Sequence, residues 1–461
     1  MILLIQPFLF CLAGLLQVFE NLLGQSVSAQ LAKDIEAGVL APAMLFSGPS
    51  ASGKGTAALE LARIISCEGN ASWGCRCSAC SRHRLIVHSD LLCLGWKPFA
   101  TEIAASSVAF LKDAANVSSR LLFIRSVRKL LARFNPVLWE DEPKGKILSP
   151  VVNSLEESLD ELELFANASG PHENLEPPVK LVEGMIKNAF KLESEGISEA
   201  IPIAQIRRAA YWSRLAPQGR EKLVILENTD RMQEEARNSL LKLLEEPPNR
   251  CRFVLCTARP GNLPSTILSR LRPYRFISRG EAVEAEVVRR VFKGQPIEGG
   301  IGTYLDTFLP VSPSSLEALA AFFAASVAYK AALLSKKQGA SLSDEIVLLG
   351  KSSAPVAEAA GFGRPKGDTA AVIALILEKA ERFEARSLFP RFLCFLLEQV
   401  SACQRSCTSS NAGSSAFSPV YYDMWRECAN WAESATGTYN LKPAQILEKM
   451  FIDLSRRMSK L

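Results

Sequence analysis

The chain has 461 residues, a formal net charge of +5 and 22% charged residues. This length allows two to four domains, and so mild a basic balance does not by itself define a nucleic-acid surface. Its 12 cysteines are too few for a disulfide-dense secreted protein. Four of them lie between residues 67 and 80, a clustering that indicates a metal site in a reducing compartment.

The first 18 residues, MILLIQPFLFCLAGLLQV, are almost wholly apolar. They carry no basic residue ahead of the apolar run, and Gln6 and Pro7 interrupt it. The run is also shorter than the roughly 20 residues that span a bilayer. We therefore favour an N-terminal extension that packs on the body of the protein, or that an upstream start adds, over a membrane or export segment.

A strand pattern over residues 43–47 runs directly into GPSASGKGT, and a helix is predicted over 57–65. A strand, a glycine-rich loop and a helix in this order predict a phosphate-binding loop, whose backbone N–H groups and lysine contact phosphate. At position 55, where such loops carry the hydroxyl that ligates Mg²⁺, this chain has glycine. Mg²⁺ is therefore a candidate cofactor, but we do not expect the loop itself to ligate it. The predicted nucleotide-binding residues are Gly48, Ser52, Gly53, Lys54, Gly55 and Thr56.

The clustered cysteines are Cys67, Cys75, Cys77 and Cys80. Four thiolates satisfy tetrahedral Zn²⁺, and we predict that these four hold a structural zinc ion. Cys77 and Cys80 have the usual two-residue separation, whereas the single residue between Cys75 and Cys77 is tight for a chain that wraps a metal. Free, partly buried thiols are the alternative, and nearby residues could substitute as ligands: His83, His88 and Cys93.

Two further apolar runs, 223–226 and 253–256, end in polar residues. As parallel strands they would place those residues at the sheet edge where α/β folds bind ligands. The first run ends in Glu227 and Asn228, where an ATPase requires an Asp for Mg²⁺ and a Glu to polarise water. An amide cannot accept a proton at neutral pH, so we predict weak or absent ATP hydrolysis by the chain alone. The second run ends in Thr257, whose hydroxyl could bond a γ-phosphate or simply close the strand.

Arg270 follows a short helix predicted over 264–268. It could reach a phosphate on a neighbouring subunit or lie on the surface, and the local sequence leaves both interpretations open. After a strand predicted to end at Leu94, helical patterns replace strand patterns between about 98 and 198. We interpret this region as an inserted helical subdomain or a partly mobile arm. Its basic stretch, 121–134, would be a solvated helix face or a DNA contact.

Together these residues resemble the bacterial clamp-loader ATPase family, the γ/τ and δ′ subunits of DNA polymerase III, within the AAA+ superfamily. The resemblance covers roughly residues 19–95 and 200–278. It rests on FENLLGQ (19–25), GPSASGKGT (48–56), the cysteine cluster followed by HSD (88–90), LLKLLEEPP (240–248) and LPSTILSR (263–270).

The resemblance implies an α/β AAA+ P-loop domain with a parallel sheet over 19–280, containing the helical insertion. It further implies a small helical lid over 281–311 and an all-α collar domain for oligomerisation over 312–461. ATP would be the bound nucleotide, and Thr257 would be the sensor-1 residue. Arg270 would be an arginine finger acting on a neighbouring subunit's ATP.

The function implied is that of a clamp-loader subunit, a cytoplasmic component of the DNA polymerase III holoenzyme with no membrane association. Its partners would be the other subunits of a hetero-pentamer, the sliding clamp and, through the complex, primed DNA. The departures at Gly55, Glu227 and Asn228 favour a δ′-like role over an ATP-hydrolysing γ/τ role. Two alternatives lie outside this assignment: a phosphotransferase resembling nucleoside monophosphate kinases, and a scaffold that binds no nucleotide.

Overall fold

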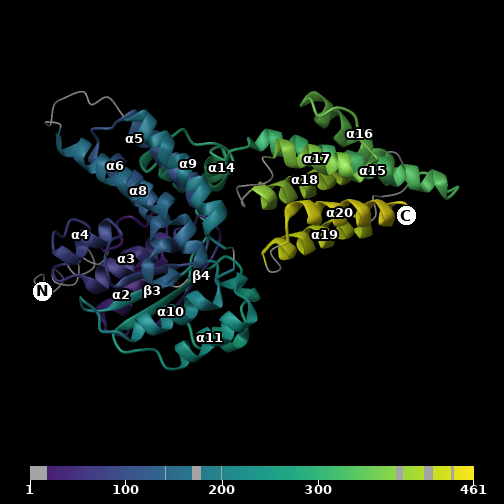
Figure 1. The fold of residues 1–461 in the computed structure, drawn as a ribbon. Coiled ribbons are helices and arrows are strands. Elements are labelled where there is room, and N and C mark those ends of the chain that lie inside the picture. The colour runs from purple at the N-terminus through teal and green to yellow at the C-terminus, as the bar shows by residue number, and fades with distance from the viewer. Residues whose placement is uncertain are drawn as a thin grey trace, which may run out of the picture. The chain divides into compact units, whose positions relative to one another are not determined.

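The computed structural model describes residues 18–140, 142–168, 178–198, 200–380, 388–409, 419–437 and 441–460 (Figure 1). Apart from Val18, the apolar N-terminal segment lies outside these described residues, and so does the interpretation given to it above. The chain divides into two compact units, Met1–Leu305 and Asp306–Leu461.

Five parallel strands form the sheet of the first unit, in the order β2-β3-β4-β1-β5. Four of them fall on the predicted apolar runs. The fifth was not predicted, because RPYR buries only Tyr274, and Pro273 is tolerated since β5 is an edge strand. The strands are β1 (Ala43–Ser47), β2 (Leu91–Leu94), β3 (Lys222–Leu226), β4 (Cys251–Thr257) and β5 (Arg272–Arg275).

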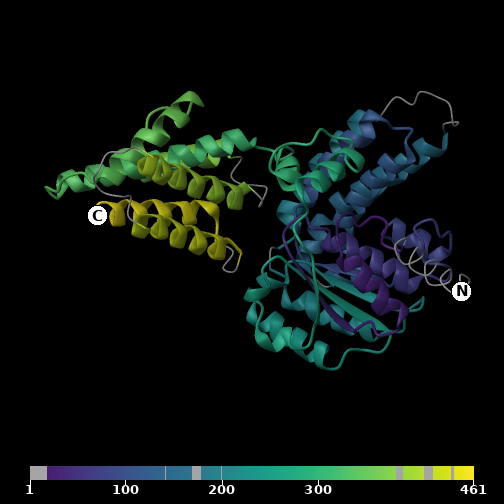
Figure 2. The ribbon, with the colours of Figure 1, turned by 180° about the vertical axis from the view of Figure 1, so that it is seen from behind.

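Helices cover both faces of this sheet, as the apolar strands require. Neighbouring residues of β1 separate into two cores: Phe46 packs in the core that includes α2 and α3, and Leu45 in the core that includes α10 and α11. Figures 1 and 2 show the two pairs on opposite sides of the strands. These helices are α2 (Val27–Glu36), α3 (Lys54–Ser66), α10 (Ile203–Arg214) and α11 (Glu234–Glu245).

The predicted insertion is a helical subdomain between β2 and α10, with its own core. Phe110 and Phe123 stack in that core with ring centroids 5.6 Å apart, and Leu155 and Met185 pack with them. Its elements are α5 (Phe99–Lys112), α6 (Val117–Leu131), the 3₁₀ turn η1 (Ala132–Phe134), α7 (Pro136–Trp139), α8 (Pro143–Ala168) and α9 (Val179–Gly196).

The basic stretch of the insertion is not a solvated face, so that interpretation is wrong. The side chains of Arg125, Arg128 and Lys129 are 12%, 13% and 14% exposed, and each pairs with a carboxylate. Arg133 is 6% exposed. Because these side chains are buried and paired with carboxylates, they are not available to contact DNA either.

Short elements complete the first unit: α4 (Ser78–Arg84), η2 (Thr229–Arg231), η3 (Pro260–Asn262), α12 (Ser265–Leu268), α13 (Glu281–Arg290) and α14 (Gly300–Asp306), the last of which ends in the second unit. Within its described residues the second unit is all helical. Its core includes Phe323, whose ring meets those of Phe392 and Phe451 edge-on. Its helices are α15 (Pro313–Lys337), α16 (Asp344–Ala359), α17 (Thr369–Lys379), α18 (Leu388–Ser409), α19 (Pro419–Gly437) and α20 (Pro443–Met458).

Helix α15 is the one described helix that is long and apolar enough to cross a membrane. Of its most apolar 18-residue window, 72% is buried inside the structure. Burial of this kind is that of a core helix, so the apolar character of α15 is explained by packing.

Candidate nucleotide site and cysteine cluster

The predicted phosphate loop connects β1 to α3, and its conformation depends on glycine. Gly48 has φ 151°, and a Cβ there would lie 2.2 Å from the carbonyl oxygen of Phe276. Gly53 has φ 96° and precedes the first residue of α3, so both positions exclude a side chain. The loop therefore leads directly into the N-terminus of α3, which is a favourable position for a phosphate.

Lys54 folds back onto the loop that carries it. Its ammonium donates to the carbonyl oxygens of Gly48 at 2.6 Å and Pro49 at 2.5 Å. The Ser52 hydroxyl donates to the same Pro49 oxygen at 2.8 Å. Burial lowers the pKa of Lys54 against the opposing influence of nearby acidic groups. The predicted loop residues are thus assembled, with Gly55 and Thr56 in the first turn of α3.

Residues 277–279 connect the phosphate loop to the FENLLGQ stretch, which carries part of the resemblance. The sequence assigned no role to residues 277–279. Gln25, in the FENLLGQ stretch, exchanges two hydrogen bonds with the backbone of Ile277, at 2.8 and 3.1 Å. Arg279 donates to the Leu23 carbonyl at 2.9 Å and also to the carbonyl of Ala51 in the phosphate loop. No local motif marks Arg279, because its contacts lie far away in the sequence.

Thr257 lies beside the phosphate loop, at the end of β4. It is paired in register with Ser47 of β1, and its carbonyl accepts the N–H of Gly48 at 3.2 Å. Its buried hydroxyl donates to Asp230 Oδ1 at 2.5 Å and accepts from the N–H of Arg259 at 2.9 Å. The carboxylate of Asp230, which follows β3, therefore orients the Thr257 hydroxyl at this edge of the sheet.

Asn228 has a structural task at the end of β3. Its backbone is left-handed, with φ 50° and ψ 47°, a conformation that asparagine adopts more readily than most residues. Its side-chain amide donates to the Trp96 carbonyl at 2.7 Å, where the chain enters the insertion.

Glu227 faces both the phosphate loop and the insertion. A Cβ at position 55 would lie 2.7 Å from Glu227 Oε1. The same oxygen is 3.7 Å from Nη2 of Arg133. Sequence reasoning missed Arg133 as a site residue because it lies in the basic stretch interpreted as solvated.

The polar contacts that Arg270 makes do not connect it to the residues around the phosphate loop. Its guanidinium pairs with Glu245 at the end of α11, at 2.6 Å, and donates to the Thr266 carbonyl, also at 2.6 Å. The side chain is 33% exposed. Both contacts are at the surface, so Arg270 is accessible to another molecule.

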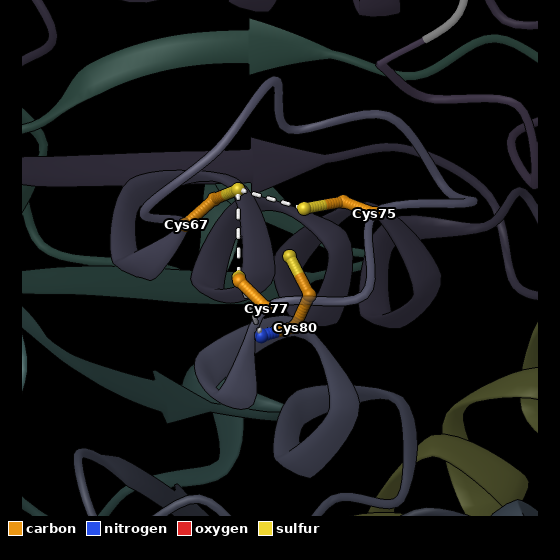
Figure 3. A group of neighbouring side chains, drawn as sticks. All are labelled: Cys67, Cys75, Cys77 and Cys80. Carbon is orange, nitrogen blue, oxygen red and sulfur yellow. Dashed lines mark hydrogen bonds between the residues drawn. The ribbon is translucent and has the colours of Figure 1, made fainter.

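The four clustered cysteines converge although a single residue separates Cys75 from Cys77. Figure 3 shows the four thiols directed toward a common point between the end of α3 and α4. The Sγ atom of Cys67 is 3.6 Å from that of Cys75 and 3.9 Å from that of Cys77, and all four Sγ atoms, Cys80 included, lie within 4.8 Å of one another. Four sulfurs around tetrahedral zinc at 2.3 Å would be about 3.8 Å apart, so the set fits this metal.

The three predicted substitute ligands lie outside this cluster of described residues. His83 and His88 instead stack on each other, with ring centroids 4.1 Å apart. Cys93 is buried in β2. Burial opposes ionisation of Cys77, but hydrogen bonds from backbone N–H groups lower the pKa of this thiol to about 6, which favours the thiolate that a metal binds.

Arg63 ties the cysteine module to the helix of the phosphate loop. It donates to the Ser72 carbonyl at 2.8 Å and lies 3.5 Å from the Cys80 sulfur. It also pairs with Glu60 at 2.9 Å, and both of these side chains are almost fully buried. Because breaking such a pair would leave a buried charge uncompensated, the module is held firmly on α3.

A phosphate loop after β1, polar residues at the ends of β3 and β4, and a four-cysteine module between the end of α3 and α4 define an AAA+-related P-loop protein. The family model described as DNA polymerase III, delta subunit, matches residues 24–130 and 167–279. The chain belongs to the clamp-loader family of DNA polymerase III delta, delta′, gamma and tau subunits. The match omits residues 131–166, which include Arg133.

Three curated relatives are similar over short regions. The chain is 32% identical over 119 residues to the DNA polymerase III subunit delta′ of Pseudomonas aeruginosa, covering 26% of this chain and 36% of that protein. It is 30% identical over 96 residues to the tau subunit of Bacillus subtilis, covering 21% and 17%. It is 37% identical over 71 residues to the tau subunit of Escherichia coli, covering 15% and 10%.

The chain thus spans well under two thirds of the length of each of these relatives. Among solved structures, the chain is similar to a DNA polymerase III gamma subunit-related protein of Thermotoga maritima. The match covers 57% of this chain and 81% of the Thermotoga chain, with 20% sequence identity and a TM-score of 0.28.

Proposed function

We propose that this chain is a subunit of the DNA polymerase III clamp loader and helps to open the sliding clamp and load it on primed DNA. Membership of the family supports this function, and so does the assembled phosphate loop. The partners would be the other loader subunits of a hetero-pentamer, the clamp and, through the complex, DNA. ATP is the nucleotide proposed for the loop, with Lys54 and the N-terminus of α3 as its main phosphate contacts.

Within the family we propose a δ′-like role, with weak or absent ATP hydrolysis by this chain. The observation that carries this proposal is the state of Asn228. A general base must accept a proton from the attacking water, whereas the Asn228 amide donates a hydrogen bond to Trp96 and is neutral. The alternative is an ATP-hydrolysing γ/τ subunit, and the retained Lys54 favours it.

Arg270 is the residue proposed to act on a neighbouring subunit's ATP. Its exposed pair with Glu245 contributes on the order of 0.2–1 kcal/mol, so the guanidinium can exchange this partner for a phosphate at little cost. Arginine fingers supplied by a neighbour raise the rate of phosphoryl transfer by about 10³–10⁵. Thr257 is proposed as the sensor of the γ-phosphate in the chain's own site, where its hydroxyl would exchange Asp230 for the nucleotide.

A structural zinc ion is proposed at the four cysteines. The module would hold the chain after α3 in place, with no part in catalysis.

The test is reconstitution with candidate loader partners, followed by clamp loading with wild type and Arg270→Ala. We expect Arg270→Ala to reduce the ATP-dependent loading rate by a large factor, up to about 10³ if the finger dominates the step. The matched control is Arg290→Ala, which removes another exposed arginine paired with a glutamate, here Glu286 at 3.6 Å. Equal loading by Arg270→Ala and wild type would refute the arginine-finger role.

ATP turnover by the isolated chain separates the two roles within the family. Little turnover, together with binding of labelled ATP that Lys54→Ala abolishes, is the δ′-like result. Vigorous turnover would establish the γ/τ role instead, and equal ATP retention by wild type and Lys54→Ala would refute nucleotide binding at this loop.

A further inference from the structure

The position beside the phosphate loop where a P-loop ATPase holds Mg²⁺ is built differently in this chain. Three features of the structure bear on it: the space next to Gly55, the partner of Glu227, and the charge of the surrounding side chains. Each can be judged against the ligands that Mg²⁺ requires, which are oxygen atoms in near-octahedral geometry.

The space next to Gly55 is taken by the carboxylate of Glu227. A Cβ at position 55 would lie 2.7 Å from Glu227 Oε1, so a serine or threonine there would require this carboxylate to move from its position near Arg133. The hydroxyl that usually ligates the metal is absent at Gly55, and the Glu227 carboxylate lies beside that position. Glycine at position 55 leaves the space that the long acidic side chain of Glu227 occupies.

The partner of Glu227 is an arginine from the insertion. Arg133 approaches the carboxylate to 3.7 Å, and both side chains are largely buried, at 6% and 12% exposed. The guanidinium is fixed by a 3.0 Å hydrogen bond to the Gly95 carbonyl and lies over the Phe99 ring, 4.9 Å from its centroid. A fixed cation thus stands next to the Glu227 carboxylate, which could otherwise have approached a metal.

The surrounding charge is also unfavourable to a second cation. A cavity of about 10 Å³, the size of one water molecule, has a lining that includes Gly55, Glu227, Lys97, Lys129 and Arg133. Glu102 pairs with both lysines, at 3.1 Å from Lys97. The three cationic side chains around this cavity outnumber the two carboxylates, Glu102 and Glu227, and both carboxylates are already paired. A divalent ion in the cavity would therefore meet net repulsion at short range.

Two other polar side chains at this edge each make one hydrogen bond. Asp230 accepts the Thr257 hydroxyl at 2.5 Å, and Asn228 donates its amide to Trp96. With no hydroxyl at position 55 and with the Glu227 carboxylate next to Arg133, the described residues at this edge do not fit Mg²⁺.

We propose that Arg133 replaces the divalent cation at this P-loop, so that the chain binds nucleotide without Mg²⁺. The inference rests on the nucleotide binding proposed above. Arg133 is a positioning residue that neutralises Glu227 and keeps the wall of the site positive toward the phosphates. Lys54 and the loop N–H groups make the direct contacts with phosphate.

The experiment measures the Kd of a fluorescent ATP analogue for the full chain, in excess Mg²⁺ and in EDTA. For wild type we expect the two Kd values to differ by less than about threefold, a small part of the 1.4 kcal/mol that a tenfold change represents. In Arg133→Met, Glu227 loses its partner and becomes available to a cation. Binding in EDTA should then weaken, and Mg²⁺ should restore affinity by more than about tenfold.

The matched control is Arg128→Met, which removes another largely buried arginine of the insertion, paired with Glu163 at 2.8 Å. Its ratio of Kd values should remain that of wild type, whereas general damage to the insertion would change both variants alike. The wild-type comparison needs no variant, so the proposal stays testable if Arg133→Met fails to fold.

The outcomes are distinguishable. Nucleotide bound in Mg²⁺ but lost in EDTA by wild type would overturn this inference and leave the proposed nucleotide binding intact. No binding under either condition would refute the proposed nucleotide binding and the inference together. Equal binding under both conditions, lost in Lys54→Ala, supports both.

Discussion

Glu193 of α9 should give the insertion a stability that depends on pH. Glu193 is 8% exposed, and its Oε2 accepts the N–H of Ala100 in the first turn of α5 at 2.6 Å. Burial raises the pKa of Glu193 from an ordinary 4.5 to about 7, although this hydrogen bond opposes the change. A difference of this size corresponds to about 3 kcal/mol between the two protonation states.

The sign follows from the direction of the pKa change. Because the folded state holds the proton more tightly than the unfolded state, the stabilising contribution of Glu193 is complete below pH 4.5 and is lost by about pH 7. Glu193→Gln keeps an oxygen for the Ala100 N–H and removes the titration. Relative to wild type, this variant should therefore gain up to about 3 kcal/mol of stability between pH 4.5 and pH 8.

Amide hydrogen exchange of α5 and α9, measured for both proteins at each pH, reports the opening free energy of the insertion itself. This local measurement is needed because the chain has two compact units that need not unfold together. The control for the change from glutamate to glutamine is Glu183→Gln, at an exposed position on the same helix. If Glu193→Gln differs from wild type by a constant amount at every pH, Glu193 is not held protonated and the reasoning is wrong.

Two further predictions concern the phosphate loop and the cysteine module. Cys80→Ser should lower the zinc content of the purified chain from about one equivalent to a small fraction, since zinc then keeps three of its four ligands. The control, Cys428→Ser in α19, should leave the zinc content unchanged. Elemental analysis measures both variants, and zinc retained by Cys80→Ser would contradict the proposed site. Gly48→Ala should destabilise the first unit by more than about 1 kcal/mol, because the new Cβ would lie 2.2 Å from the Phe276 carbonyl oxygen. The control is Gly184→Ala in α9, which has open space around it and should be neutral or stabilising by up to about 1 kcal/mol. Urea unfolding compares the two variants, and equal stability would refute the close approach at Gly48.

The elements that the sequence predicted well are those encoded locally. Continuous apolar runs marked four of the five strands, and GPSASGKGT marked the phosphate loop, because strand, loop and helix are contiguous. The edge strand β5 carries no apolar run, since only Tyr274 faces the core. The cysteines were found by their clustering, and only the fold showed that Cys75 and Cys77 can both turn toward one point.

The contacts that the sequence could not predict join distant segments. A basic helix face looks the same in sequence whether water or carboxylates surround it. The partners that bury this stretch, among them Glu60 for Arg125 and Glu163 for Arg128, lie on other helices. For the same reason Arg133 and Arg279 gave no signal as residues of the nucleotide site.

The departures at Gly55, Glu227 and Asn228 look independent in the sequence, but the structure makes them parts of one arrangement. Gly55 leaves the space that the Glu227 carboxylate fills. Asn228 holds the Trp96 carbonyl, and the preceding Gly95 lies so close to the Glu227 backbone that a Cβ there would be 2.2 Å from its carbonyl oxygen.

This close approach fixes the start of the insertion against the end of β3, and the insertion then returns Arg133 to the Glu227 carboxylate. An acidic residue at position 228 alone would leave the paired carboxylate, the missing hydroxyl and the fixed guanidinium in place. A metal-dependent ATPase site would therefore require changes in β3, in the phosphate loop and in the insertion together.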